Sequence, residues 1–87
     1  VRHIVIVEDE IAIAQNYCDA LRRQGYKVTH YRNRPEAMAQ LAIRLPDLAI
    51  IDVGLGDEPE GGFDLCRELR SRAPELPIVF LTARDDD

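Results

Sequence analysis

Apolar residues gather in four short runs separated by polar segments, and these runs predict four β-strands. The first run is almost wholly apolar and β-branched, and the third is wholly apolar, as is typical of strands covered on both faces of a parallel sheet. The second run alternates enough to have one wetter face, which favours a place at the sheet edge. The predicted strands cover residues 3–8, 26–31, 48–51 and 78–82.

Between the strands, apolar residues recur at steps of three and four, which predicts three helices. The first covers residues 10–24 and ends at Gly25, with cations in its last turn. The second opens at residues 33–36 and is stopped by Pro46, and the third ends before Pro74. The apolar positions that define the helices are Ile11, Ala14, Tyr17, Cys18 and Leu21 in the first, Ala37, Met38, Leu41, Ala42 and Leu45 in the second, and Phe63, Leu65, Cys66 and Leu69 in the third.

The regular alternation of strands and helices argues for an α/β fold with an open parallel sheet and right-handed crossovers. A chain of 87 residues is one domain at most, spanning residues 1–87. The apolar run of residues 78–81 would leave an open sheet edge, which is a liability in water. We therefore expect either that the chain continues after Asp87 or that it pairs with a second copy. Val1 in place of a methionine also suggests a piece of a longer gene product.

Charge and composition narrow the class of function. The formal net charge is −5, with 16 acidic residues against 11 basic ones, and such a field favours cations and disfavours nucleic acid. No segment approaches the roughly 18 apolar residues of a membrane span, and there is no signal-peptide pattern. A cytoplasmic protein is expected, with Cys18 and Cys66 as small apolar core residues in a reducing compartment rather than a disulfide.

Acidic residues follow two of the most apolar strands. Glu8 and Asp9 end the first, and Asp52 ends the third. Ligands of doubly wound sheets bind beyond the carboxyl ends of the strands, so these carboxylates are expected to converge there. Like charges at close range need a positive partner or a proton, and a hard divalent cation such as Mg²⁺ fits oxygen ligands. The competing interpretation, that Asp9 or Glu10 only caps the first helix, is disfavoured by the matching position of Asp52.

A carboxylate in this position can act as a nucleophile on phosphorus, forming an acyl phosphate. A bound cation would neutralise charge on the transferring group. Thr82 ends the fourth predicted strand, and its hydroxyl would be able to donate a hydrogen bond to a phosphoryl oxygen. Ala83 is small enough to leave room for that group.

Three segments resemble the signature segments of response-regulator receiver domains. They are Ile4-Val5-Ile6-Val7-Glu8-Asp9-Glu10, Asp47-Leu48-Ala49-Ile50-Ile51-Asp52 and Phe80-Leu81-Thr82-Ala83-Arg84. The third is particularly similar to the OmpR/PhoB-like regulators, which carry a C-terminal winged-helix DNA-binding domain. The resemblance covers the whole chain and implies a flavodoxin-like (CheY-like) doubly wound sheet with strand order 2-1-3-4, lacking the fifth strand and the last helices.

The resemblance also implies roles for individual residues. Asp52 would accept a phosphoryl group from a sensor histidine kinase, and Thr82 would be the switch hydroxyl. Glu8, Asp9, Asp52 and the backbone carbonyl of Gly54 would bind Mg²⁺. Such a chain is a switch that assists its own phosphotransfer and dephosphorylation rather than an enzyme with an independent substrate. It would control a fused output domain, most simply in transcription, and the outward face of the first helix would dock the kinase.

Two departures from the family pattern stand out. Gly56 occupies the place of a usual proline, and the loop to Gly61-Gly62-Phe63 is about two residues longer than usual. The lysine and the aromatic switch residue of the family's fifth strand are absent, as is the surface that usually carries dimerisation. A true truncation would be crippled in phosphorylation, because that lysine pairs with the phosphoryl group.

Two other classes of function compete with the phosphorylated switch. One is a receiver-like interaction module that never takes up phosphate, which the altered loop and the missing strand would suit. The other is a flavodoxin-like cofactor binder, which is disfavoured because the first strand-to-helix turn carries Glu8-Asp9-Glu10 instead of a phosphate cradle rich in Ser, Thr or Gly. His3 and His30 are expected to be solvated or structurally satisfied.

Overall fold

β-branched and other apolar residues build the centre of the sheet, where both faces are covered. In the computed structural model, which describes residues 2–55 and 60–81, the elements alternate as predicted. They are β1 (His3–Val7), α1 (Ile11–Arg23), β2 (Lys27–Tyr31), α2 (Arg34–Leu41), β3 (Leu48–Asp52), α3 (Gly61–Arg72) and β4 (Ile78–Leu81). The strands are parallel and lie in the order β2-β1-β3-β4, which confirms the predicted doubly wound topology.

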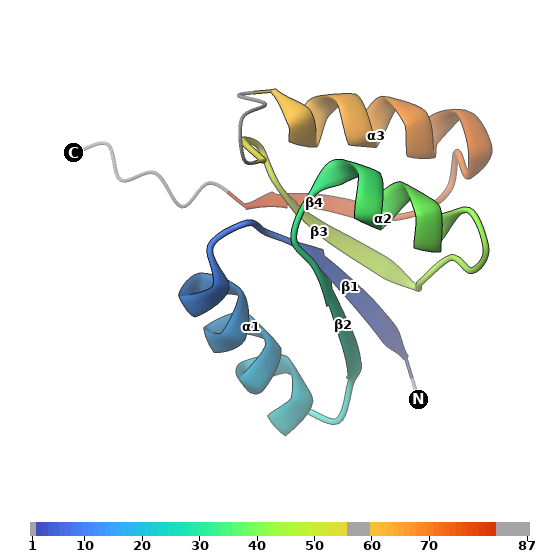
Figure 1. The fold of residues 1–87 in the computed structure, drawn as a ribbon. Coiled ribbons are helices and arrows are strands. Elements are labelled where there is room, and N and C mark those ends of the chain that lie inside the picture. The colour runs from blue at the N-terminus through green and yellow to red at the C-terminus, as the bar shows by residue number, and fades with distance from the viewer. Residues whose placement is uncertain (1, 56–59, 82–87) are drawn as a thin grey trace.

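The helices divide between the two faces of the sheet. α1 covers one face over β1 and β2, and α2 and α3 cover the opposite face (Figure 1). Successive side chains of β1 therefore enter different cores: Val5 and Val7 pack with α2 and α3, and Ile4 and Ile6 pack with Cys18 of α1. Because both faces are apolar, the sequence of β1 shows no alternation.

α2 is shorter than predicted. It ends at Leu41, and the chain then turns so that Ile43 and Leu45 are exposed. Pro46 accounts only for the last of these residues, because a proline disfavours the helical conformation of Leu45, the residue before it. The prediction that Ala42 and Leu45 belong to the apolar face of this helix was therefore wrong.

The apolar stripe of α1 is narrower than predicted. Ala14 and Cys18 are buried, but Ile11 and Tyr17 are exposed. Small residues bring the helix close to β1 and β2, which are the strands it covers, and the larger side chains on its flanks stay open to solvent. Both cysteines are free thiols, Cys18 buried and Cys66 half-buried.

α3 begins at Gly61, earlier than Phe63, where its apolar pattern begins. Leu65 and Leu69 are buried, as their spacing indicated. Phe63 instead lies on the exposed flank, where its ring meets that of Phe80 edge to face with centroids 4.9 Å apart. Val79 and Phe80 of β4 are exposed, and the described residues provide no strand on the outer side of β4. None of the described helices has the length and apolarity needed to cross a bilayer.

A pair of isoleucines tests this distribution of buried and exposed residues. Ile51 is 0% exposed and Ile43 is 80% exposed. Ile51→Ala should lower the free energy of unfolding by about 2–5 kcal/mol, because it removes buried methyl groups and leaves a cavity. Ile43→Ala should change it by less than about 0.5 kcal/mol. Urea denaturation measures both values, and equal effects would contradict the described packing.

Candidate functional site

The register between β1 and β3 determines which residues reach the carboxyl edge of the sheet together. The two strands pair in parallel from Ile4 with Leu48 to Val7 with Ile51. The next residues along the chain are Glu8, which directly follows β1, and Asp52, which ends β3; Asp9 follows Glu8 into the turn before α1. The sequence therefore brings three acidic residues to one end of two adjacent central strands.

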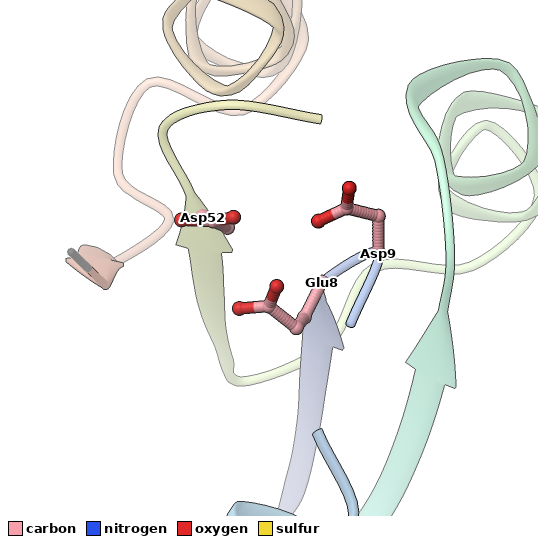
Figure 2. A group of neighbouring side chains, drawn as sticks. All are labelled: Glu8, Asp9 and Asp52. Carbon is pink, nitrogen blue, oxygen red and sulfur yellow. The ribbon is translucent and has the colours of Figure 1, made fainter. Parts of the chain in front are cut away.

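The carboxyl groups of Glu8, Asp9 and Asp52 converge in the structure. One oxygen atom of each lies within 4.8 Å of the others. Figure 2 shows the three groups around a common space beyond the ends of β1 and β3. Glu8 is 1% exposed, and Asp9 and Asp52 are half-buried, so the cluster has a deep side and an open side.

Glu8 is the least solvated member of this cluster. Its Oε2 accepts a hydrogen bond from the backbone N–H of Glu10 (3.1 Å). Its buried Oε1 has no hydrogen-bond donor among the described residues. Burial raises the pKa of Glu8 to about 7, the charge of Asp52 and the neighbouring carboxyl groups add to the rise, and the Glu10 N–H opposes it.

Helix capping does not account for the acidic residues of this turn. Glu10 is the residue that precedes α1, but its side chain makes no capping hydrogen bond. The Glu8 side chain points toward the space that it shares with Asp9 and Asp52 (Figure 2). The acidic groups thus lie close enough to repel one another.

The donor set fits a hard divalent cation. All three side chains offer carboxylate oxygens, which suit Mg²⁺ or Ca²⁺. A cation would also satisfy Glu8 Oε1, a buried acceptor to which no group in residues 2–55 and 60–81 donates. Both the charges and the unsatisfied oxygen would be compensated by an ion in this space.

Gly62 brings the first turn of α3 against the backbone of Asp52. A Cβ at Gly62 would lie 2.0 Å from the carbonyl oxygen of Asp52 and 2.8 Å from the Cα of Val53. The Gly62 N–H donates to the Val53 carbonyl at 2.7 Å. Only glycine allows this approach, so Gly62 fixes the chain on which the Asp52 side chain depends. In the sequence, the signal for this contact is the Gly61-Gly62 pair, which the apolar pattern places in the loop before the helix.

Gly54 and Thr82 are the remaining predicted site residues. Gly54 lies half-exposed in the bend after β3, two residues after Asp52. Thr82, with Ala83 and Arg84, lies outside the described residues. β4 does bring its last residue, Leu81, into register with Asp52.

The raised pKa of Glu8 predicts a pH-dependent stability. Between about pH 4.5 and 7, the folded chain keeps a proton at Glu8 that the unfolded chain has released, so the free energy of unfolding falls as the pH rises. Loss of the Glu8 proton should contribute up to about 3 kcal/mol to this fall. Glu8→Gln should remove it and make the protein more stable than the unsubstituted form at pH 8 without divalent cations.

Urea denaturation at pH 5 and pH 8, with EDTA or with Mg²⁺, measures this contribution. Mg²⁺ should stabilise the unsubstituted protein more at pH 8 than at pH 5, because a cation can replace the proton. The exposed Glu75 is the matched control, and Glu75→Gln should leave the pH dependence unchanged. If Glu8→Gln and the unsubstituted protein had the same pH dependence of stability, the attribution of that dependence to Glu8 would be refuted.

Gly62→Ala should damage the site through the backbone. We expect a loss of at least about 2 kcal/mol of stability, because rigid backbone atoms must move, and a weaker response to Mg²⁺. Gly25 is the control: its φ of +96° makes Gly25→Ala strained, but nothing lies near its added Cβ. Gly25→Ala should therefore lower the melting temperature and leave the Mg²⁺ dissociation constant unchanged. Loss of Mg²⁺ binding in both variants would show a general effect of instability.

Known proteins resemble this chain in sequence and in fold. Residues 4–87 match the family model for the response regulator receiver domain. The chain is 38% identical over 82 residues to the transcriptional regulatory protein CreB of Escherichia coli (strain K12), covering 94% of this chain and 35% of CreB. It is 37% identical over 84 residues to the transcriptional regulatory protein AfsQ1 of Streptomyces coelicolor, covering 97% of this chain and 36% of that protein. The chain thus spans about a third of the length of these relatives.

Solved structures agree with the sequence comparison. The non-phosphorylated HemR receiver domain from Leptospira biflexa superposes with a TM-score of 0.87 and 28% identity, over 100% of this chain and 68% of HemR. The response regulator TrrA from Thermotoga maritima, solved in complex with Mg²⁺ and BeF, superposes with a TM-score of 0.89 and 26% identity, over 98% of this chain and 72% of TrrA. The fold, the site geometry and these matches together confirm the resemblance: the chain belongs to the response regulator receiver domain family.

Proposed function

We propose that this chain is the phosphorylated switch of a two-component signalling protein, with Asp52 as the phosphoacceptor. The observation that carries the proposal is the convergence of Glu8, Asp9 and Asp52 at the carboxyl edge of the sheet. Asp52 is half-buried at the end of β3, so its carboxylate is held by the strand and still open to a donor. Glu8 is too buried to serve as the acceptor.

Mg²⁺ is the cofactor of this proposal. Glu8, Asp9 and Asp52 would hold it through carboxylate oxygens, with the backbone carbonyl of Gly54 as a further ligand. The TrrA receiver was solved with Mg²⁺ and BeF, which supports the same cofactor for a related fold. When bound, the ion would offset the negative charge of the transferring phosphoryl group.

The reaction is a nucleophilic displacement at phosphorus. A carboxylate oxygen of Asp52 forms a bond to phosphorus while the phosphorus–nitrogen bond of a phosphohistidine breaks. The imidazole of the donor leaves with the bonding electrons and takes up a proton. An acyl phosphate is high in energy, so a phosphoramidate donor such as a histidine kinase suits the acceptor.

Thr82 would bind the phosphoryl group once it has arrived. β4 ends in register with Asp52 at Leu81, which supports a place for the following hydroxyl near the acceptor. In this proposal, the hydroxyl donates to a phosphoryl oxygen and so transmits the charge on Asp52 to the end of β4.

The output of the switch would be transcription. CreB and AfsQ1 are named transcriptional regulatory proteins, and this chain matches about a third of each. A DNA-binding output domain would therefore belong to the remainder of the protein. The kinase would dock on the exposed polar residues of α1, among them Gln15, Asn16 and Asp19.

Acetyl phosphate provides a direct test of this function. The full-length protein incubated with acetyl phosphate and Mg²⁺ should gain the mass of one phosphoryl group in intact-mass spectrometry. Asp52→Asn should abolish the gain, because an amide oxygen is a far weaker nucleophile than a carboxylate. EDTA should lower the rate by at least about tenfold, because the charge on the phosphoryl oxygens is then uncompensated.

Asp47 is the matched control for this experiment, because it precedes the amino end of β3 and lies away from the acidic cluster. Its Oδ2 accepts the backbone N–H of His3, a bond that an asparagine can keep. Asp47→Asn should retain phosphorylation. A full-length protein that gains no phosphoryl group would contradict the proposal and favour a receiver-like module that acts by binding alone.

A further inference from the structure

His30 of β2 contacts the acidic site from the side. Its ring Nε2 lies 2.7 Å from the backbone carbonyl oxygen of Glu8 in a half-buried position. β2 pairs with β1 in parallel, with His30 beside Ile6 and Tyr31 beside Val7. The side chain of His30 therefore reaches Glu8, the first residue after the end of β1.

The partner atom determines which ring nitrogen carries the proton. A carbonyl oxygen only accepts hydrogen bonds, so Nε2 of His30 must be the N–H donor. The backbone N–H of Glu8 in turn donates to the carbonyl of Tyr31 at 3.0 Å. β2 thus binds both polar backbone groups of Glu8, one through its main chain and one through His30.

The Glu8 carbonyl belongs to the peptide group that joins Glu8 to Asp9. A peptide group is planar, so fixing its oxygen also fixes the direction in which the chain enters Asp9. The carboxylates of Glu8 and Asp9 repel each other, and without restraint the turn would relax to separate them. The hydrogen bond from His30 opposes that relaxation.

We propose that His30 is a positioning residue of the acidic cluster, which holds the Glu8–Asp9 peptide so that both carboxylates face Asp52. This inference rests on the proposed function, because it concerns the same site and the same ion. His30 would thus contribute to Mg²⁺ binding without contacting the ion. Outer partners of metal ligands influence affinity because they orient the ligands before the ion arrives.

His3 offers a contrast within the same pair of strands. Its Nε2 lies 2.8 Å from the hydroxyl of Thr29, and its backbone N–H donates to Asp47. It sits at the amino end of β1, opposite the acidic edge. A substitution of His3 therefore removes a similar interstrand hydrogen bond without touching the cluster.

Mg²⁺ titration of the full-length protein by calorimetry tests the inference. His30→Ala should raise the Mg²⁺ dissociation constant by about 10–100-fold. His30→Gln should bring it back to within about threefold of the unsubstituted value, because the glutamine amide can place an N–H donor near the position of Nε2. His3→Ala should leave it within about threefold while lowering the melting temperature as much as His30→Ala does.

NMR of the ring nitrogens provides a readout that stability does not change. The Nε2–H signal of His30 should show the protonated Nε2 form and should shift on addition of Mg²⁺, whereas the ring signals of His3 should not shift. Rescue by glutamine together with this shift would support the positioning role.

The outcomes separate the two proposals. An unsubstituted protein that binds no Mg²⁺ would overturn both the metal site and the role of His30. Mg²⁺ binding that is unchanged in His30→Ala would overturn the inference and leave the proposed function intact. Equal losses of Mg²⁺ affinity in His30→Ala and His3→Ala, without rescue by glutamine, would show that His30 has only a structural role.

Discussion

The parallel register of β1 and β3 is the constraint on which the site depends. Backbone hydrogen bonds pair Val7 with Ile51, and the residues that follow are Glu8 and Asp52. A slip by one residue would place one of these carboxylates on the wrong face of the sheet. Because both cores are apolar, register depends on how the individual side chains fit: Val5 and Val7 pack in one core, and Ile4 and Ile6 pack in the other. The apolar packing of the sheet thus holds together charges that would separate in water.

Apolar packing thus imposes an unfavourable charge repulsion at the acidic cluster. Burying the Glu8 carboxylate beside Asp52 disfavours its ionised form and weakens the folded state near neutral pH. The same charge repulsion favours the binding of a cation, since an ion between the carboxylates would remove the repulsion and satisfy Glu8 Oε1. The repulsion that lowers the stability of the ion-free protein therefore also favours binding of the ion.

Much of this could be predicted from the sequence, because it depends on local pattern. The apolar β-branched runs indicated the strands, and the acidic residues at their ends indicated where carboxylates would meet. The features that were missed depend on tertiary contacts. Tyr17 and Phe63 have helical spacing but lie on the flanks of their helices, and both stay exposed, Phe63 despite its ring contact with Phe80. The bond from His30 to Glu8 joins neighbouring strands, and nothing in the sequence distinguishes His30 from His3.

The contact between Gly62 and Asp52 has a consequence for how the chain tolerates insertions. On one side of the segment 56–59, Leu55 is buried in the core, and on the other side Gly62 donates to Val53. Both anchors are set by packing and hydrogen bonding, not by the number of residues between them. Two additional residues in a loop of this size change its closure entropy by only about a few tenths of a kcal/mol. The length of this segment can therefore change without displacing Asp52 from the carboxyl edge of the sheet.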